Sequence, residues 1–125
     1  MTDEELKKER EVRKESGYTT IDVVIYSKLG LNLRLSGRIA EKCKEYENRI
    51  YIKTKFEDTN RPIREANGKS ILEILSLGVA PGTKLQIKVE GEDEKAEKLT
   101  LLLYDIISGN FSEDRKPYPE HFNPW

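Results

Sequence analysis

The chain has 125 residues, of which 36% are charged and 36% hydrophobic, and its 22 basic and 23 acidic side chains give a formal net charge of −1. The length predicts a single domain around one core, and the balanced charge argues against direct nucleic-acid binding through bulk phosphate neutralisation. A single cysteine excludes an internal disulfide, and the lack of a long apolar run or a signal peptide predicts a cytoplasmic protein with no membrane association.

The two ends of the chain differ from its middle. Residues 1–16 are mostly charged, with Glu and Lys side chains spaced four residues apart, which predicts a charged N-terminal extension that could be helical. Residues 109–125 combine three prolines with four aromatic side chains, so no regular element is expected in this tail. We expect the tail either to pack on the domain or on a second copy of the chain, or to be offered to a partner in extended form.

Residues 17–108 hold most of the apolar side chains and are predicted to form the domain. In chain order, alternation of apolar and polar residues predicts strands at 20–26, 48–56 and 83–90, and a weaker edge strand at 61–66 that contains Pro62. Helical spacing of apolar residues predicts helices at 32–46, with Asn32 as its N-cap, and at 92–108. The stretch 70-SILE-73 has the form of a capping box and predicts a short helix that ends near Leu77.

The predicted order of elements is β-α-β-β-α-β-α. Each helix has one apolar face, and a two-layer arrangement can bury all of these faces at once. We therefore predict an α+β domain in which a four-stranded, largely antiparallel sheet carries three helices on one face.

Little in the sequence points to catalysis. His121 is the only histidine and lies in the tail, and Cys43 falls on the apolar stripe of a predicted helix. The sequence has no glycine-rich phosphate loop, metal-ligand spacing or nucleophile elbow. We expect no enzymatic activity, no metal and no cofactor.

Two predicted helix starts are more informative. At residues 30–38, the backbone N–H groups of Leu33, Arg34 and Leu35, together with the side chains of Arg34 and Arg38, could bind an anion. The alternative is an Asn-capped helix with two solvated arginines. At the second start, a phosphate on Ser70 would lie near the helix N-terminus and beside Lys69, and the alternative is that Ser70 is only a cap.

The stretch 67-NGKSILEILSLGVAPGTKLQIKVEGEDE-94 closely resembles the second half of HPr, the histidine-containing phosphocarrier family of the bacterial phosphoenolpyruvate:sugar phosphotransferase system. The similarity extends over residues 19–107 and leaves both ends uncovered. It implies the family's fold, an open-faced β-sandwich with the same β-α-β-β-α-β-α order.

The resemblance also implies where the chemistry of the family would lie. The first helix of the family begins at a G-L-H-x-R-P motif whose histidine carries the phosphoryl group, and the matching stretch here is 30-GLNLRL-35. Asn32 stands at the position of the histidine, Arg34 keeps the arginine, and Leu35 replaces the proline. A carboxamide nitrogen is delocalised into its carbonyl and offers no nucleophile comparable to an imidazole, so the resemblance predicts a degenerate site that does not carry phosphate.

Ser70 matches the serine that an ATP-dependent kinase phosphorylates in many relatives. In the family, the apolar surface at the start of the same helix docks partner proteins. The resemblance therefore implies a regulatory or adaptor protein of the phosphotransferase system, active in carbon catabolite repression. Its expected partners are other proteins: phosphotransferase-system components, a HPr-type kinase or a transcriptional regulator. We expect Asn32, Arg34 and Arg38 to bind an anion or a partner, and Lys69, Ile71 and Leu72 to dock one. A homodimer through either extension, a phosphocarrier that uses His121 and a small-anion sensor stay open as alternatives.

Overall fold

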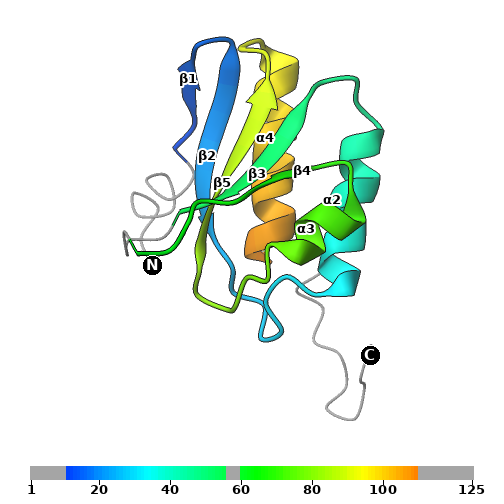
Figure 1. Cartoon of the computed structure of the whole chain (residues 1–125). Helices are drawn as coiled ribbons and strands as arrows, with labels where there is room; N and C mark the ends of the chain where they lie inside the picture. The colour runs from blue at the N-terminus through cyan, green and yellow to red at the C-terminus, as the bar shows by residue number, and fades with distance from the viewer. Residues whose placement is uncertain (1–10, 56–59, 110–125) are drawn as a thin grey trace.

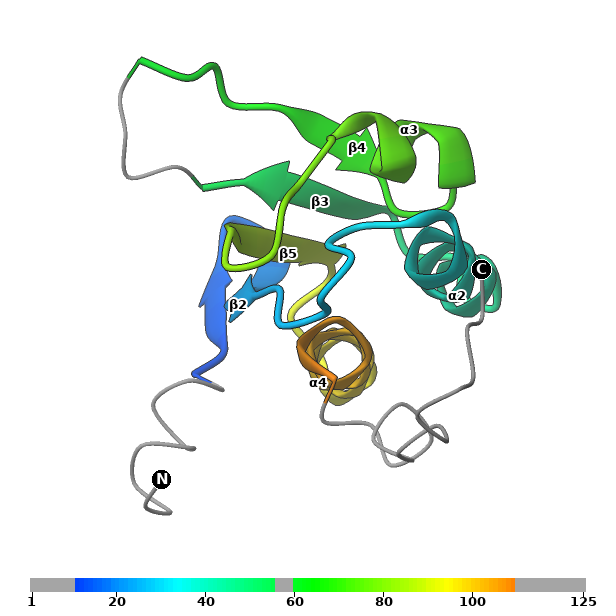
Figure 2. The same cartoon turned by 90° about the horizontal axis from the view of Figure 1, so that it is seen from below.

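The computed structural model describes residues 11–55 and 60–109, which form a five-stranded sheet with three helices packed on one of its faces (Figures 1 and 2). The strands lie in the order β1-β2-β5-β3-β4, and every neighbouring pair is antiparallel. The elements in chain order are β1 (Arg13–Glu15), β2 (Tyr18–Val24), α2 (Leu33–Lys44), β3 (Ile50–Thr54), β4 (Glu65–Asn67), α3 (Ile71–Ser76), β5 (Lys84–Glu90) and α4 (Glu94–Ser108). From β2 onward this is the predicted order, and the α+β fold is confirmed.

Strands β3 and β5 alternate between a buried and a partly exposed face, whereas in β2 Thr19, Thr20 and Ile21 are buried in succession. In β5 the side chains of Leu85, Ile87 and Val89 are buried, and those between them are only partly covered. Ile21 and Ile52 lie opposite Ile87 on the two neighbouring strands, so the apolar side chains of three strands meet in one layer. Within residues 11–55 and 60–109, no helix lies on the other face of the sheet (Figure 2), as expected for an open-faced sandwich.

The helices cover the apolar layer with one face each. The predicted stripe of α2 is confirmed, because Leu35, Ile39 and Cys43 are buried. On α4, Leu99 and Leu103 are buried one turn apart. Asp93 caps α4 by accepting a hydrogen bond from the backbone of Ala96 at 3.0 Å.

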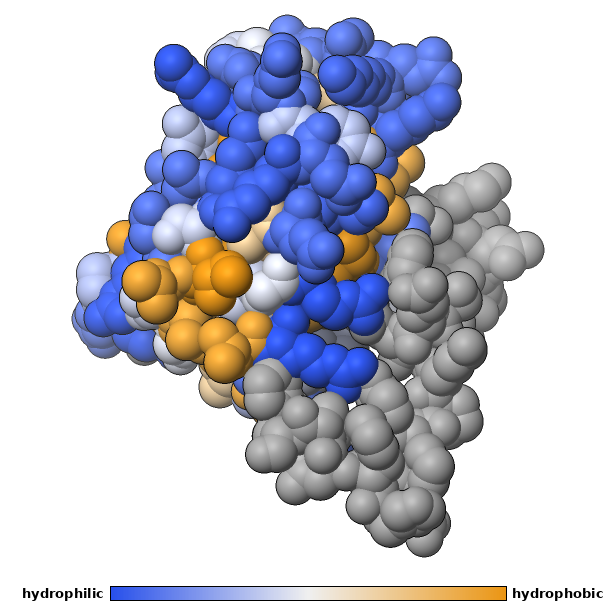
Figure 3. Space-filling view, turned by 90° about the vertical axis from the view of Figure 1, so that its right-hand side faces the viewer, coloured by the Kyte–Doolittle hydropathy of each residue, from blue (hydrophilic) through white to orange (hydrophobic). Residues whose placement is uncertain are grey.

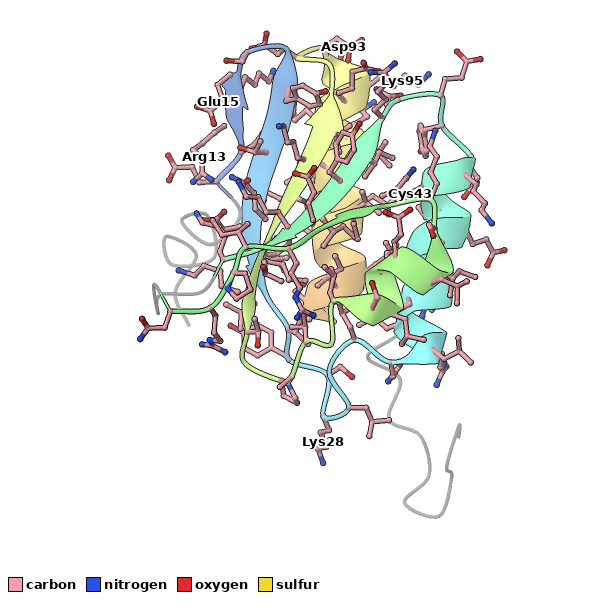
Figure 4. All side chains as sticks on the ribbon, in the orientation of Figure 1. Arg13, Glu15, Lys28, Cys43, Asp93 and Lys95 are labelled. Carbon is pink, nitrogen blue, oxygen red and sulfur yellow. The ribbon has the colours of Figure 1, made fainter. Side chains whose placement is uncertain are left out.

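A fifth strand, β1, was not expected. The sequence predicted a four-stranded sheet and a charged extension over residues 1–16 that could be helical, but Arg13–Glu15 pairs with β2 at the edge of the sheet, where Arg13 and Glu15 lie on the outer strand (Figure 4). Tertiary contacts explain the difference: Arg13 forms an ion pair with Asp22 at 3.1 Å, and Lys14 reaches Glu97 of α4 at 3.1 Å. Pairing with β2 thus fixes a segment that has too few apolar side chains to fold by itself.

Strand β4 is shorter than predicted and begins later. It covers Glu65–Asn67 rather than residues 61–66, and Pro62 precedes it. Proline has no backbone N–H to donate to a neighbouring strand, which accounts for the late start. The predicted tail and His121 lie outside the described residues, as do residues 1–10.

Candidate functional site

Helix α2 begins with Asn32, whose side chain does the capping that the sequence predicted. The Asn32 Oδ1 atom accepts a hydrogen bond from the backbone N–H of Leu35 at 2.8 Å, and the Asn32 backbone is extended. This bond changes one part of the anion-site hypothesis. The N–H of Leu35, one of three donors expected to face an anion, is already satisfied within the chain.

Gly30 fixes the position of this helix start. It has a left-handed φ of +66°, and a Cβ atom built on it would lie 2.2 Å from the carbonyl oxygen of Val79. The next residue, Leu31, donates its backbone N–H to the same carbonyl at 3.0 Å. The loop before α2 and the loop after α3 therefore touch through their backbones, and only glycine fits at this contact.

Ser70 caps helix α3, as predicted, but only one of the two hydrogen bonds of a capping box forms. Ser70 Oγ accepts the backbone N–H of Glu73 at 3.2 Å. The Glu73 carboxylate accepts instead from the backbone N–H of Asn67 at 3.2 Å, while the N–H of Ser70 donates to the Asn67 carbonyl at 3.0 Å. The N–H of Ser70 is thus bonded within the turn before the helix. The Glu73 carboxylate binds the N–H of Asn67 rather than that of Ser70.

Apolar side chains of α2 and α3 reach the surface together. Leu72 on α3 is 77% exposed, Leu33 at the first position of α2 is 56% exposed, and Leu29 before α2 is 58% exposed. Ile71 and Leu75 are partly buried beside them, and the two helices pack against each other. Figure 3, which shows this side of the molecule, shows apolar residues gathered in one area. We call this group the α2–α3 surface: Leu29, Leu33, Ile71, Leu72 and Leu75.

Only part of this surface was expected from the sequence. Leu72 and Ile71 were predicted to dock a partner, whereas Leu29 and Leu33 were not singled out. A signal for Leu33 was available, since it follows the N-cap and falls off the buried stripe of Leu35 and Ile39. An apolar residue off the buried stripe of an amphipathic helix has no internal surface to pack on.

Basic residues lie near the same helix starts. Arg34 and Arg38 are one helical turn apart on α2 and are partly buried. Lys28 points away from the domain at the end where α2 begins (Figure 4), and Lys69 immediately precedes Ser70. The structure thus gathers Asn32, Arg34 and Arg38 at one helix start and places Lys69 and Ser70 at another.

The remaining candidate side chain, Cys43, offers no accessible nucleophile. It is fully buried, and burial raises the pKa of its thiol to about 12 against the opposing effect of the Lys69 charge. Among residues 11–55 and 60–109, no group of three histidine, cysteine or acidic side chains could hold a metal ion. In the same part of the chain, none of the helices combines the length and the apolarity that spanning a membrane demands.

Comparison with known proteins places this site in a family. A family model described as the PTS HPr component phosphorylation site matches residues 19–103. The phosphocarrier protein HPr of Neisseria meningitidis is 32% identical over 91 residues, which are 73% of this chain and 92% of that protein. The chain belongs to the HPr family. Another HPr, from Xylella fastidiosa, is 26% identical over 74% of this chain and 94% of its own length.

Solved HPr structures share the fold. HPr from Bacillus anthracis superposes with a TM-score of 0.61 at 24% identity and covers 74% of this chain and 99% of its own. HPr-C-His from Thermoanaerobacter tengcongensis gives a TM-score of 0.53 at 27% identity and covers 72% of this chain and 94% of its own. These matches confirm the open-faced β-sandwich, and β1 lies before the first residue that the HPr family model matches.

One feature of the sequence sets this HPr-family chain apart from a phosphocarrier that uses histidine. The segment that matches the phosphorylation-site model, residues 19–103, contains no histidine, because the chain has a single one, at position 121. Within this segment, α2 begins with Asn32 as its N-cap.

Proposed function

We propose that this HPr-family chain is a non-catalytic adaptor or regulatory protein that binds partner proteins but does not relay phosphate. The observation that carries the proposal is the absence of histidine from the whole segment that matches the family's phosphorylation site. We further propose that Asn32 stands where phosphocarriers of the family keep their histidine, because it is the residue that opens α2.

The chemistry of Asn32 supports this proposal. Phosphoryl transfer to a side chain needs a lone pair that can attack phosphorus, and the nitrogen of a carboxamide has lost its lone pair to the carbonyl. The amide oxygen is engaged as well, since it accepts the N–H of Leu35 at 2.8 Å. Asn32 therefore stabilises the helix start and has no group left for a phosphoramidate.

The α2–α3 surface supports the binding half of the proposal. Three of its leucines are more than half exposed at the helix start and on the neighbouring helix, and exposed apolar side chains that gather in one area mark interaction sites. The multiphosphoryl transfer protein of Salmonella typhimurium contains a segment 28% identical to this chain over 92 residues, which are 23% of that protein. We therefore propose that the partners are other components of the phosphotransferase system.

Incubation with enzyme I and labelled phosphoenolpyruvate tests the loss of the carrier reaction. We expect no label that is stable to base and labile to acid, the behaviour of a phosphorylated ring nitrogen. The Asn32→His variant is the matched control, because it restores an imidazole at the same helix start and should gain such label if the surface still binds enzyme I. Acid-labile label on the unaltered chain would refute the proposal.

We also propose that Ser70 is phosphorylated as a regulatory switch. Ser70 is partly exposed, and its Oγ acts as an acceptor toward the N–H of Glu73, so transfer of the γ-phosphoryl group of ATP can replace the hydroxyl proton without removing the cap. The added charge would lie beside Lys69 and next to Ile71 and Leu72, and would change how the α2–α3 surface binds a partner.

Mass spectrometry after incubation with ATP and a HPr-type kinase tests the switch. We expect one added phosphate on the unaltered chain and none on Ser70→Ala. Ser76→Ala is the matched control, because Ser76 is exposed on the same helix and should leave the modification intact. A phosphate that persists in Ser70→Ala, or no phosphate at all, would remove the switch and leave the adaptor role standing.

A further inference from the structure

The described part of the chain ends at Gly109, at the end of the molecule where the α2–α3 surface begins (Figure 1). Helix α4 ends at Gly109, at the same end of the molecule at which α2 begins (Figures 1 and 2), and the two helices pack against each other. Gly109 is left-handed, with a φ of +78°, and ends the helix there. The point from which residues 110–125 continue is therefore at the same end of the molecule as Leu33, the first residue of α2 (Figure 1).

The composition of residues 110–125 complements an apolar surface. They include Phe111, Tyr118, Phe122 and Trp125, together with three prolines. Each aromatic side chain buries roughly 150–250 Å² when it packs, and proline-rich segments bind apolar grooves at a low entropic cost because their backbone is already restricted. Neither of the extensions lies within the segment that matches the family model, so this tail is an addition to the common domain.

Length and charge permit the tail to reach this surface. Sixteen residues in extended conformation span roughly 50 Å, whereas a domain of this size measures roughly 30 Å across. The tail has three acidic and two basic side chains. Basic residues lie near the two helices in the chain: Lys28 precedes α2, Arg34 and Arg38 belong to it, and Lys69 precedes α3. Charge therefore does not oppose contact.

We propose that residues 110–125 fold back on their own molecule and cover the α2–α3 surface. The occupant is the chain's own tail rather than a second copy, because a short tether gives the tail an effective concentration in the millimolar range. The inference rests on the proposed function in one respect: where a partner docks on this surface, it has to displace the tail, which lowers its apparent affinity.

Trp125 makes the inference testable without any partner, because it is the only tryptophan of the chain. In the full chain we expect a blue-shifted tryptophan emission and several-fold weaker quenching by acrylamide than in a free peptide of residues 110–125. The Leu33→Asp/Leu72→Asp variant should return both readouts to the values of the peptide. Its two side chains are mostly exposed, so the charges do not enter the core.

Ile63→Asp is the matched control, because Ile63 is 65% exposed but belongs to the loop before β4; it should leave the fluorescence of the full chain unchanged. The inference is overturned if Trp125 of the unaltered chain behaves like the peptide, or if the double aspartate variant leaves it protected. Protection that disappears on dilution would assign the contact to a second copy and overturn the proposal equally. None of these readouts depends on phosphate transfer or partner binding, so the adaptor role can fail separately.

Discussion

At the scale of single residues, Asn32 stabilises the start of α2. Its side chain accepts the N–H of Leu35, and removal of such a cap costs about 0.5–2 kcal/mol. We predict that Asn32→Ala lowers the free energy of unfolding by about 1 kcal/mol, measured by urea denaturation. Asn32→Asp keeps an acceptor and should lose little; equal losses in both variants would show that the cap is not the cause.

Gly30 and Gly17 offer a matched comparison of two left-handed glycines. A Cβ atom at Gly17 meets nothing within 4 Å, whereas one at Gly30 lies 2.2 Å from the Val79 carbonyl oxygen. Gly17→Ala should cost about 1–2 kcal/mol from the left-handed backbone alone. Gly30→Ala adds overpacking of about 1–3 kcal/mol and should lower the free energy of unfolding by clearly more. Similar thermal stability of the two variants would contradict the close contact between the loops.

Cys43 reports on the core. Because burial raises the pKa of its thiol to about 12, hardly any thiolate exists at neutral or mildly alkaline pH, and the side chain is also sterically protected. We predict that Ellman's reagent labels Cys43 at pH 8 only at the rate of unfolding, and quickly in denaturant. Rapid labelling of the native chain would show that α2 does not pack over the sheet as described.

Residues whose role depends on their neighbours in the chain could be predicted from the sequence. Asn32 and Ser70 were predicted as caps and act as caps, since an N-cap bond spans three residues. The exposure of Leu29 and Leu33 was not predicted, and Glu73 accepts from Asn67 rather than from Ser70, as a complete capping box would require. The exposure of a leucine depends on which elements pack nearby, and the partner of a carboxylate depends on the turn before the helix, so neither follows from local spacing.

At the scale of elements, strands with a regular alternation of apolar and polar residues were predicted, and a strand without this alternation was missed. Strands β2, β3 and β5 were found because one face of each is buried, which imposes alternation on the sequence. Strand β1 has three charged residues and no such pattern. Its only local signal is the Ser16-Gly17 turn, where both residues have positive φ. The acidic partners in the ion pairs of β1 belong to β2 and α4, so the sequence of β1 alone does not reveal these pairs.

The ion pairs of Asp22 predict a dependence on pH. Burial alone would raise the pKa of this carboxyl, but hydrogen bonds and charge from Lys55, at 2.9 Å, and from Arg13 outweigh burial and hold the pKa below its usual value of 3.8. A carboxyl with a depressed pKa stabilises the fold above its unfolded pKa, and this contribution is lost as the pH falls through the folded pKa.

Thermal unfolding at pH 7 and at pH 2 to 3 measures this contribution. Asp22→Asn should lower the free energy of unfolding at pH 7 by about 0.2–1 kcal/mol for each ion pair that is lost. On acidification, its free energy of unfolding should fall less than that of the unaltered chain. Glu94→Gln is the control, since Glu94 forms an exposed pair with Lys98, and it should leave the acid profile nearly unchanged. An identical acid profile for Asp22→Asn would contradict the role of the three-residue ion-pair network on the sheet.

At the scale of the whole molecule, the chain keeps the fold of the HPr family, and residues 1–18 and 104–125 lie outside the segment that matches the family model. The fold could be predicted because the order of elements and the apolar layers depend on patterns spread over some ninety residues. The site could be predicted only in part, because the α2–α3 surface combines residues from two helices and a loop. In the proposed function, partner binding depends on this surface, and the lack of phosphate transfer depends on Asn32.

The most direct test of this account is a reconstituted phosphotransferase reaction in which this chain replaces HPr between enzyme I and a sugar-specific component, with phosphoenolpyruvate as the donor. The account predicts no phosphorylated sugar with the unaltered chain, and transfer only when a genuine phosphocarrier is added. Sugar phosphate formed by this chain alone, in proportion to its concentration, would contradict the central claim that it binds but does not relay.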